Sequence, residues 1–430
     1  MVVPHVREFK RALSLLLTPR FGTYFVATLL SNVGTWSQQV AEPWLLLSLG
    51  ASPFLIGLDT FVQSAPALVL ILAGGMLADT GDRRRVITTF QAIQMMCPVT
   101  LVALLLTGTV VPWMVIALSL IVGITDALSM PSYQTIAPSI VRHDQIGTAI
   151  ALNASQFNLS RILGPTLAGI LMASIGAIGC FLANALSYVP FIAVALWILP
   201  PGRSVPRQNE RLDRHSLFLG LRRVLTTPHM RGALLTTLTT SLMCGPLVIL
   251  CPVLVRDILG GDASEFSLAI GAFGVGGLLG ALALLGFEAE HDGRKLSTGF
   301  AAVSGGMTAL AAINPWAHIL PLLLMLAGFS MAVSNTSANS LLQATAPSRL
   351  RGRTVSLYML AMRGGLSIGG LLSGMSADIL GVRYALLVNG VLAFVAHVVI
   401  GRQWTRFPLP DMEKRATAML KPPAKAIFPE

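Results

Sequence analysis

The stretch QTIAPSIVR, Gln134 to Arg142, recurs as QATAPSRLR, Gln343 to Arg351, at a spacing of 209 residues. Both copies begin Gln-x-x-Ala-Pro-Ser, and both follow a long apolar segment. Downstream of each copy, single polar residues match in the same order: Arg161 with Arg363, and Asn184 with Asn389. A chance collection of helices does not repeat itself in this way. The repeat therefore predicts a parallel arrangement of two equivalent halves with six spans each.

The sequence around both copies is apolar enough for a bilayer. Hydrophobic residues make up 54% of the chain, charged residues only 11%, and the mean hydropathy is +0.72, whereas soluble domains carry about a quarter of charged residues. Apolar windows of about 20 residues alternate with short polar breaks, and the alternation typical of strands is absent. We therefore predict an all-α polytopic membrane protein with twelve transmembrane helices in two six-helix bundles. The predicted spans are 21–49, 54–78, 86–108, 111–136, 147–175, 178–200, 230–255, 264–287, 296–313, 316–342, 355–378 and 382–401.

Charge placement gives the predicted domains and their orientation. We expect an N-terminal bundle (1–200), a central cytoplasmic loop with a surface helix (201–229), a C-terminal bundle (230–402) and a cytoplasmic tail (403–430). Of the 30 lysines and arginines, 26 fall on the face that carries both termini and two on the opposite face. Because cytoplasmic loops are enriched in basic residues, both termini are predicted to face the cytoplasm. The predicted location of this multi-pass protein is the inner cell membrane.

Several function classes are disfavoured by the sequence. The net charge of +11 lies almost wholly in loops, without the basic helical stripe and interleaved aromatics of a nucleic-acid protein. The four cysteines lie in apolar windows without metal-ligand spacing. The glycines of GAFGVGGLLG lack the strand and lysine of a nucleotide site. We expect no enzyme activity, no cofactor and no metal. The expected partners are a small-molecule substrate, protons and the lipid bilayer, and the expected state is a monomer.

Two motifs carry a family resemblance. GGMLADTGDRRRV, residues 74–86, resembles the signature between spans two and three of the major facilitator superfamily, and SRILGPTLAG, residues 160–169, is similar to the span-five motif of its antiporters. The resemblance covers all twelve spans and is closest to the drug:proton antiporter branch that includes the enterobactin exporter. Thr80 and Asp82 depart from the usual signature, and Asp126 occupies the region of span four where many drug antiporters carry an arginine.

The resemblance implies a secondary transporter that exports a small amphipathic molecule, drug-like or siderophore-like, by alternating access in exchange for protons. The sequence contains no ATP site, so transport must draw on a gradient. Two alternatives stay open at this point. A facilitator or importer of the same fold would differ only in coupling, and a transport-inactive membrane sensor would differ in function altogether.

Charged residues inside the spans are the candidates for proton coupling, because a charge at mid-bilayer costs about 2.5 to 3.5 kcal/mol unless it has a partner or water. The candidates are Glu42, Asp59, Asp126 and Arg161. Glu42 is the first choice because it shares a face of span one with polar residues. Asp126 and Arg161 are expected to interact, either as a structural ion pair or in transport. Asp59 either contributes to coupling or lies in interfacial water.

The remaining candidates concern the cavity, the gate and helix packing. In the superfamily spans one, four, seven and ten line the cavity, so two polar stripes are expected to contact substrate: Asn32, Trp36 and Gln39 on span one, and Ser334, Asn335 and Asn339 on span ten. A cytoplasmic gating latch is expected from Asp79, Arg83, Arg84 and Arg363, with snorkelling to headgroups as the alternative for Arg363. Close helix packing or bending is expected at Gly164, Pro165, Gly369 and Gly370.

Overall fold

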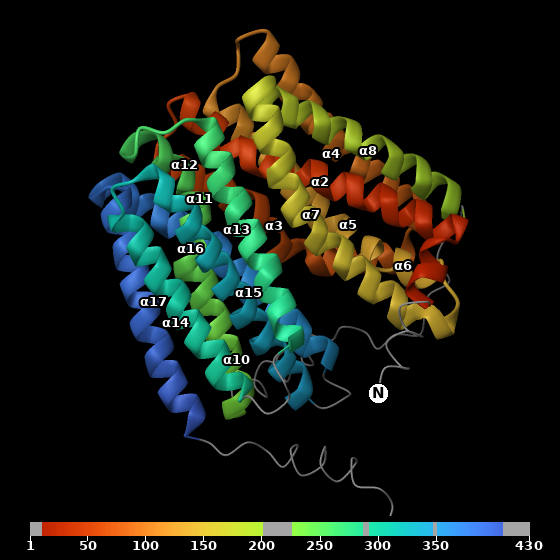
Figure 1. Cartoon of the computed structure of the whole chain (residues 1–430). Coiled ribbons are helices and arrows are strands. Elements are labelled where there is room, and N and C mark those ends of the chain that lie inside the picture. Colours follow the sequence, from red (N-terminus) through yellow and green to blue (C-terminus); the bar gives the residue numbers. More distant parts are fainter. Residues whose placement is uncertain (1–10, 201–225, 287–291, 347–350, 407–430) are drawn as a thin grey trace, which may run out of the picture.

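The computed structural model describes residues 11–200, 226–286, 292–346 and 351–406 (Figure 1). Within these ranges every regular element is a helix, which confirms the all-α fold. The expected surface helix of the central loop falls on residues 201–225, and most of the expected tail on 407–430. Both segments lie outside the described residues.

The first half contains six long helices and the short helix α6, besides the 3-10 turn η1 (His143–Gln145). Three of the long helices, α2, α3 and α5, begin with proline, whose fixed φ suits the first helical position and whose missing N–H would have no helical acceptor there. The helices are α2 (Pro19–Ser48), α3 (Pro53–Thr80), α4 (Arg83–Leu106), α5 (Pro112–Gln134), α6 (Ile136–Ser139), α7 (Ile146–Ser174) and α8 (Ala177–Ile198).

The second half repeats this plan with one broken helix. Its five unbroken long helices are α13 (Ala263–Gly286), α14 (Gly293–Ile313), α15 (Leu320–Thr345), α16 (Arg351–Leu380) and α17 (Val382–Thr405). The sixth span begins with α10 (Pro228–Thr239) and continues through α11 (Pro246–Ile249) and α12 (Cys251–Val253), with π-helical turns at η2 (Thr240–Cys244) and η3 (Leu254–Ile258).

The break in this span differs from the plain helix that we predicted over 230–255. Pro246 has no N–H to donate to the preceding turn, and its ring would crowd the carbonyl there. The Gly245 N–H instead bonds to the Thr240 carbonyl, five residues back, at 3.2 Å. The proline therefore widens the helix into a π turn, a feature that often accompanies functional sites.

The helix lengths fit a membrane. Eight described stretches are long and apolar enough to cross one: 83–106, 112–139, 177–198, 228–249, 263–284, 293–313, 317–345 and 382–405. The four other long helices, α2, α3, α7 and α16, have 28 to 30 residues. At 1.5 Å per residue such helices exceed the roughly 30 Å of hydrocarbon.

The two halves share a core at one end of the molecule only. We call the end where α2 begins and α17 ends the terminal end, and the other the opposite end; α10 and α17 reach the terminal end toward the bottom of Figure 1. At the opposite end one apolar cluster includes Leu46 and Ile56 of the first half and Leu250 and Phe266 of the second. The ring of Phe266 also stacks on Trp44 of α2, with centroids 5.3 Å apart.

At the terminal end each half has its own core. A cluster around Phe21, Ile136 and Phe191 contains residues of the first half only. A second cluster around Met230 and Trp404 contains residues of the second half only. The halves are therefore packed together at the opposite end and have separate cores at the terminal end.

Candidate functional site

Glu42 is held inside the first half, close to the opposite end. Its side chain is only 4% exposed. The Ser119 hydroxyl of α5 donates a hydrogen bond to one carboxylate oxygen, and Gln38 Nε2 donates to the other at 3.2 Å. Gln38 Oε1 in turn accepts a bond from Asn184 Nδ2 of α8 at 2.6 Å. Three helices thus orient this carboxyl group.

Asp59 of α3 is the second buried acid, and it lies beside the first. It is 5% exposed, and its Oδ1 atom has no hydrogen-bond partner. Glu42 is near enough to act on it electrostatically, and Ser119 is a neighbour of both carboxyl groups. The alternative that Asp59 lies in interfacial water is therefore wrong. The structure brings together two of the four predicted coupling residues, and no cation pairs with either of them in the described part of the chain.

Asp126 has a different partner from the one we predicted. Arg363 Nη1 of α16 lies 3.5 Å from Asp126 Oδ2 of α5, and both side chains are about half exposed, at 40% and 52%. The ion pair therefore joins the two halves, and the predicted pair of Asp126 with Arg161 is wrong. The same Nη1 atom lies 3.7 Å from the Met130 sulfur, so Arg363 reaches across to α5 instead of snorkelling to headgroups.

Arg161 of α7 faces an aromatic ring. Its guanidinium carbon lies 5.4 Å from the ring centroid of Trp36 on α2, a cation–π distance. Trp36 also packs edge-on against Phe157, at 5.9 Å between centroids. Tyr358 of α16 in the other half acts on Arg161 electrostatically. The side chain is exposed, and residues of both halves, Trp36 and Tyr358, act on it.

The residues expected to contact substrate differ in their exposure and in their hydrogen-bond partners. Asn32 donates to Gln156 Oε1 of α7 at 3.2 Å, whereas Gln39 is exposed. On α15, Asn339 accepts a bond from Gln343 at 3.1 Å, and the Asn335 carbonyl accepts one from Tyr358 at 3.1 Å.

Ser334, the third of the expected positions on α15, does not lie on a cavity wall. It is fully buried, and its carbonyl accepts a hydrogen bond from Ser297 of α14 at 3.1 Å. The bond from Ser297 uses the backbone carbonyl, and the Ser334 hydroxyl itself has no hydrogen-bond partner among the described residues. Full burial corrects the expectation that Ser334 contacts substrate in this conformation.

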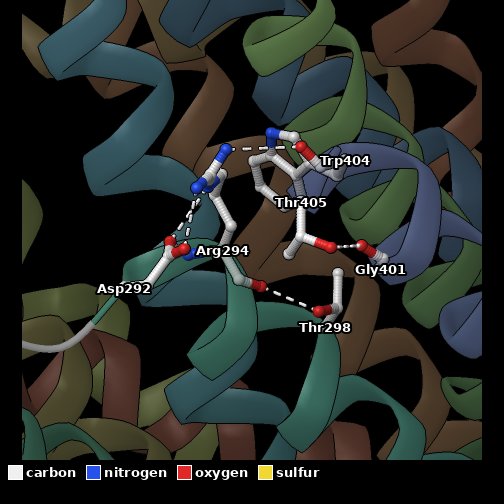
Figure 2. Close-up of polar contacts among 6 residues, drawn as sticks. All are labelled: Asp292, Arg294, Thr298, Gly401, Trp404 and Thr405. Carbon is white, nitrogen blue, oxygen red and sulfur yellow. Dashed lines mark hydrogen bonds and ion pairs between the residues drawn. The ribbon is translucent and has the colours of Figure 1, made fainter. Parts of the chain in front are cut away.

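The charged loop between the second and third helices occurs in both halves, with different surroundings. In the first half Arg85, with 87% side-chain exposure, lies 3.7 Å from Asp82. In the second half Arg294 Nε and Nη2 donate to the two oxygens of Asp292 at 2.9 and 2.8 Å, and Nη1 donates to the Trp404 carbonyl at 3.3 Å (Figure 2). The hydrogen bonds from Arg294 hold the pKa of the Asp292 carboxyl below its ordinary value.

The predicted latch is not assembled from the residues that the structure describes. The side chain of Asp79 lies outside them. Arg83 has a buried Nε without a hydrogen bond, and Arg84 is partly buried. Arg363 lies against Asp126. Because the halves have separate cores at the terminal end, a latch at that end would have to form in another conformation.

The predicted packing glycines lie where helices approach closely. A Cβ on Gly164 would overlap the Cβ of Trp36, and one on Gly369 would overlap the Leu242 carbonyl of the π turn. A Cβ on Gly370 would lie 2.7 Å from the Ile249 side chain. α7 continues as a helix through Pro165.

Sequence reasoning missed Ser119 and Asp378. Ser119 is a single hydroxyl in an apolar span, a common pattern that carries no signal. Asp378 of α16 accepts hydrogen bonds from the Ser52 hydroxyl at 2.9 Å and from the Phe54 N–H at 3.2 Å, across the two halves. Its signal was a short motif, Gly-Met-x-Ala-Asp, that ends at Asp79 in the first half and at Asp378 in the second.

Comparisons with known proteins place this arrangement among transporters. A family profile described as transmembrane secretion effector matches residues 11–427. The staphyloferrin A transporter of Staphylococcus aureus is 26% identical, covering 86% of this chain and 92% of the relative. The multidrug efflux pump Tap of Mycolicibacterium fortuitum is 27% identical (85% and 93% covered), and the enterobactin exporter EntS of Shigella boydii is 27% identical (91% and 95% covered).

Solved structures share the fold at low sequence identity. A point mutant of the nucleoside transporter NupG superposes with a TM-score of 0.72 at 12% identity, covering 90% of this chain and 99% of that one. A bacterial homologue of the iron transporter ferroportin, at 17% identity and the same coverage, gives a TM-score of 0.65 in its inward-facing state and 0.58 in its outward-facing state.

Proposed function

The chain belongs to the transmembrane secretion effector family of the major facilitator superfamily, and we propose that it exports a small amphipathic molecule, drug-like or siderophore-like, in exchange for protons. The three relatives, a siderophore transporter, a siderophore exporter and a drug efflux pump, support export of this class of cargo. We propose that one chain suffices, since both halves of the site come from the same chain.

Alternating access is supported by the distribution of the cores. A transporter of this kind exposes its central residues to one side at a time by rocking one bundle against the other. The shared core closes the opposite end, and the terminal end has separate cores. If both termini are cytoplasmic, as the basic residues predict, this is an inward-facing state.

The observation that carries the proton-exchange proposal is the carboxyl pair of Glu42 and Asp59. Two buried carboxylates without a cation repel each other, and a proton on one of them removes that repulsion. Ala41 and Leu45, which flank Glu42 in α2, belong to the core that closes the opposite end. Opening that end would break this core and hydrate the pair. Protons would then enter from the outer side, as exchange for exported cargo requires.

The test is transport into everted membrane vesicles across whose membrane a proton gradient is imposed. Vesicles that contain the protein should accumulate members of a panel of dyes and iron-free siderophores, and an uncoupler should abolish accumulation. The Glu42→Gln variant should retain equilibrium binding but lose accumulation. If cargo only equilibrates, with no effect of the uncoupler, the protein is a facilitator and the proposal of proton exchange is wrong.

A further inference from the structure

Arg161 is an uncompensated cation in the middle of the molecule. Among the described residues it makes no hydrogen bond or ion pair, and its guanidinium packs on the face of Trp36. The ion pair of Asp126 and Arg363, which joins the two halves, is neutral in itself. Asp378, the acid at the opposite end, is engaged with Ser52 and Phe54. None of these acids pairs with Arg161. A cation on a membrane-spanning helix is costly without an anion, so the site favours a ligand that brings one.

The residues around Arg161 pack so that they hold its aromatic neighbour in place. Gly164, one turn later on α7, leaves room for Trp36 only because it has no side chain, since a Cβ there would overlap that of Trp36. The indole is thereby held beside the guanidinium, and it makes a T-shaped contact with the ring of Phe157. A guanidinium offers a planar fork of donors that matches a carboxylate or a similar oxyanion. The neighbouring aromatic surface suits a flat or apolar group.

We propose that Arg161 and Trp36 bind the cargo, and that the cargo is an anion whose charge lies next to a flat apolar group. This inference deepens the proposed export function and rests on it. Arg161 pairs with the negative group, and Trp36 stacks on the flat group. Export then releases the anion when rearrangement of the halves separates it from Arg161 or hydrates the pair.

The test is equilibrium binding to the purified full chain in lipid nanodiscs, with three probes that share one ring system and differ in charge: naphthoate, naphthamide and naphthyl-trimethylammonium. The wild type should bind naphthoate about tenfold more tightly than naphthamide, the difference expected for a charge-assisted bond. Arg161→Gln should remove this preference, and Arg161→Lys should restore part of it. Arg142→Gln, which changes the net charge equally at an exposed loop position, is the matched control and should keep the preference.

Three results would overturn the inference: no binding of naphthoate to the wild type, equal affinity for the three probes, or an unchanged preference in a folded Arg161→Gln protein. Thermal unfolding of each variant shows whether it is folded, and Arg161→Lys keeps the test valid if Arg161→Gln is not. Vesicle transport separates this inference from the proposed function. If both the wild type and Arg161→Gln accumulate cationic dyes in a proton-driven manner, the proposed export function stands and the proposed anion site is wrong.

A second inference rests on a repeated motif at the contact of α3 and α16. Gly-Met-Leu-Ala-Asp ends at Asp79 near the end of α3, and Gly-Met-Ser-Ala-Asp ends at Asp378 near the end of α16. The two helices pack against each other and run in opposite directions, because α3 ends at the terminal end and α16 at the opposite end. Each motif thus lies at the level where the other helix begins.

At the opposite end the second motif caps the first helix of the pair. α3 begins with Pro53, and its N-cap residue Ser52 makes no capping bond of its own to the helix. The carboxylate of Asp378 takes the place of this cap, because it accepts hydrogen bonds from the Ser52 hydroxyl and the Phe54 N–H. A carboxylate at a helix N-terminus also interacts favourably with the helix dipole. We propose that Asp378 is a latch that holds the opposite end closed, and that this cap breaks when that end opens.

The test uses Cys251, which is fully buried in the shared core, as a reporter of opening. Asp378→Asn should raise its rate of labelling by a membrane-impermeant maleimide about fivefold, the effect expected from weakening one cap. Ser52→Ala should give a smaller rise. Asp262→Asn is the matched control, because Asp262 caps α13 from within the same half through Ser264 and Glu265. Unchanged labelling in Asp378→Asn, or an equal rise in Asp262→Asn, would show that Asp378 is not a latch.

Discussion

The two halves share a helix plan but bury opposite kinds of ionisable side chain. The first half buries the acids Glu42 and Asp59, with no cation beside them among the described residues. The second half buries Arg294, neutralised by Asp292, and His397, whose Nε2 lies 3.0 Å from the Thr240 hydroxyl. The repeat thus preserves the scaffold, while the chemistry differs. A carboxyl group that carries protons needs a charge that is not already neutralised by a cation. Among these residues the buried acids of the first half meet that condition, whereas Asp292 does not.

The largest effect in this comparison is expected from breaking the compensated charge of the second half. Arg294→Ala leaves Asp292 without its bidentate partner and the Trp404 carbonyl without a donor. Removing one member of a buried pair costs about 3 kcal/mol of unfolding free energy. Arg85→Ala at the equivalent loop of the first half, where the pair is exposed, should cost less than about 1 kcal/mol.

Denaturant unfolding of the purified variants in one detergent measures both losses. Arg294→Lys, which keeps the charge but not the fork, should fall between Arg294→Ala and the wild type. Equal losses at Arg294 and Arg85 would show that burial does not distinguish the two loops.

A moderate effect is expected for the ion pair between the halves. A double-mutant cycle on Asp126→Asn and Arg363→Gln should give a coupling energy of about 0.2 to 1 kcal/mol, because both side chains are about half exposed. The cycle on Asp126→Asn and Arg161→Gln is the control and should give a coupling near zero. A larger coupling in the control cycle would restore the pair that the sequence suggested.

The smallest effect is expected from acid. Because Arg294 depresses the folded-state pKa of Asp292, the stability from this carboxylate is fully present above its unfolded value, about 3.9. It is lost as the pH falls through the lower folded-state pKa. The stability gap between the wild type and Asp292→Asn should therefore be constant near neutral pH and shrink below about pH 4. A gap that shrinks on raising the pH instead would contradict this assignment.

The fold followed from the sequence because its signals are local. Apolar windows, proline starts and the repeat of Gln134 at Gln343 depend on neighbouring residues and on chain order, and they predicted the two helical halves. The π turn before Pro246 also has a local cause, the proline itself. From the sequence we nevertheless predicted an unbroken helix there. Helix period alone placed Ser334 on a polar stripe, but it does not reveal which neighbouring helix that stripe meets.

The site followed only in part, since its contacts depend on how the halves meet. Glu42 and Asp59 were recognised as costly charges, but their proximity depends on the packing of α2 against α3 and α5. Asp126 was assigned to Arg161, in the next span along the chain. Its actual partner, Arg363, comes from the other half, and the relative position of the halves is set by the conformational state. No spacing within one half carries that information.

In the proposed function, the carboxyl pair of the first half carries the proton that drives export. The most direct measurement is the pH inside proteoliposomes during transport, with equilibrium binding of the same cargo measured in parallel. In the wild type, each cargo movement should be accompanied by a proton movement in the opposite direction. Glu42→Gln should keep cargo binding and lose the proton signal, whereas His397→Asn in the second half should keep both. Undiminished proton movement in Glu42→Gln would show that Glu42 does not carry the exchanged proton.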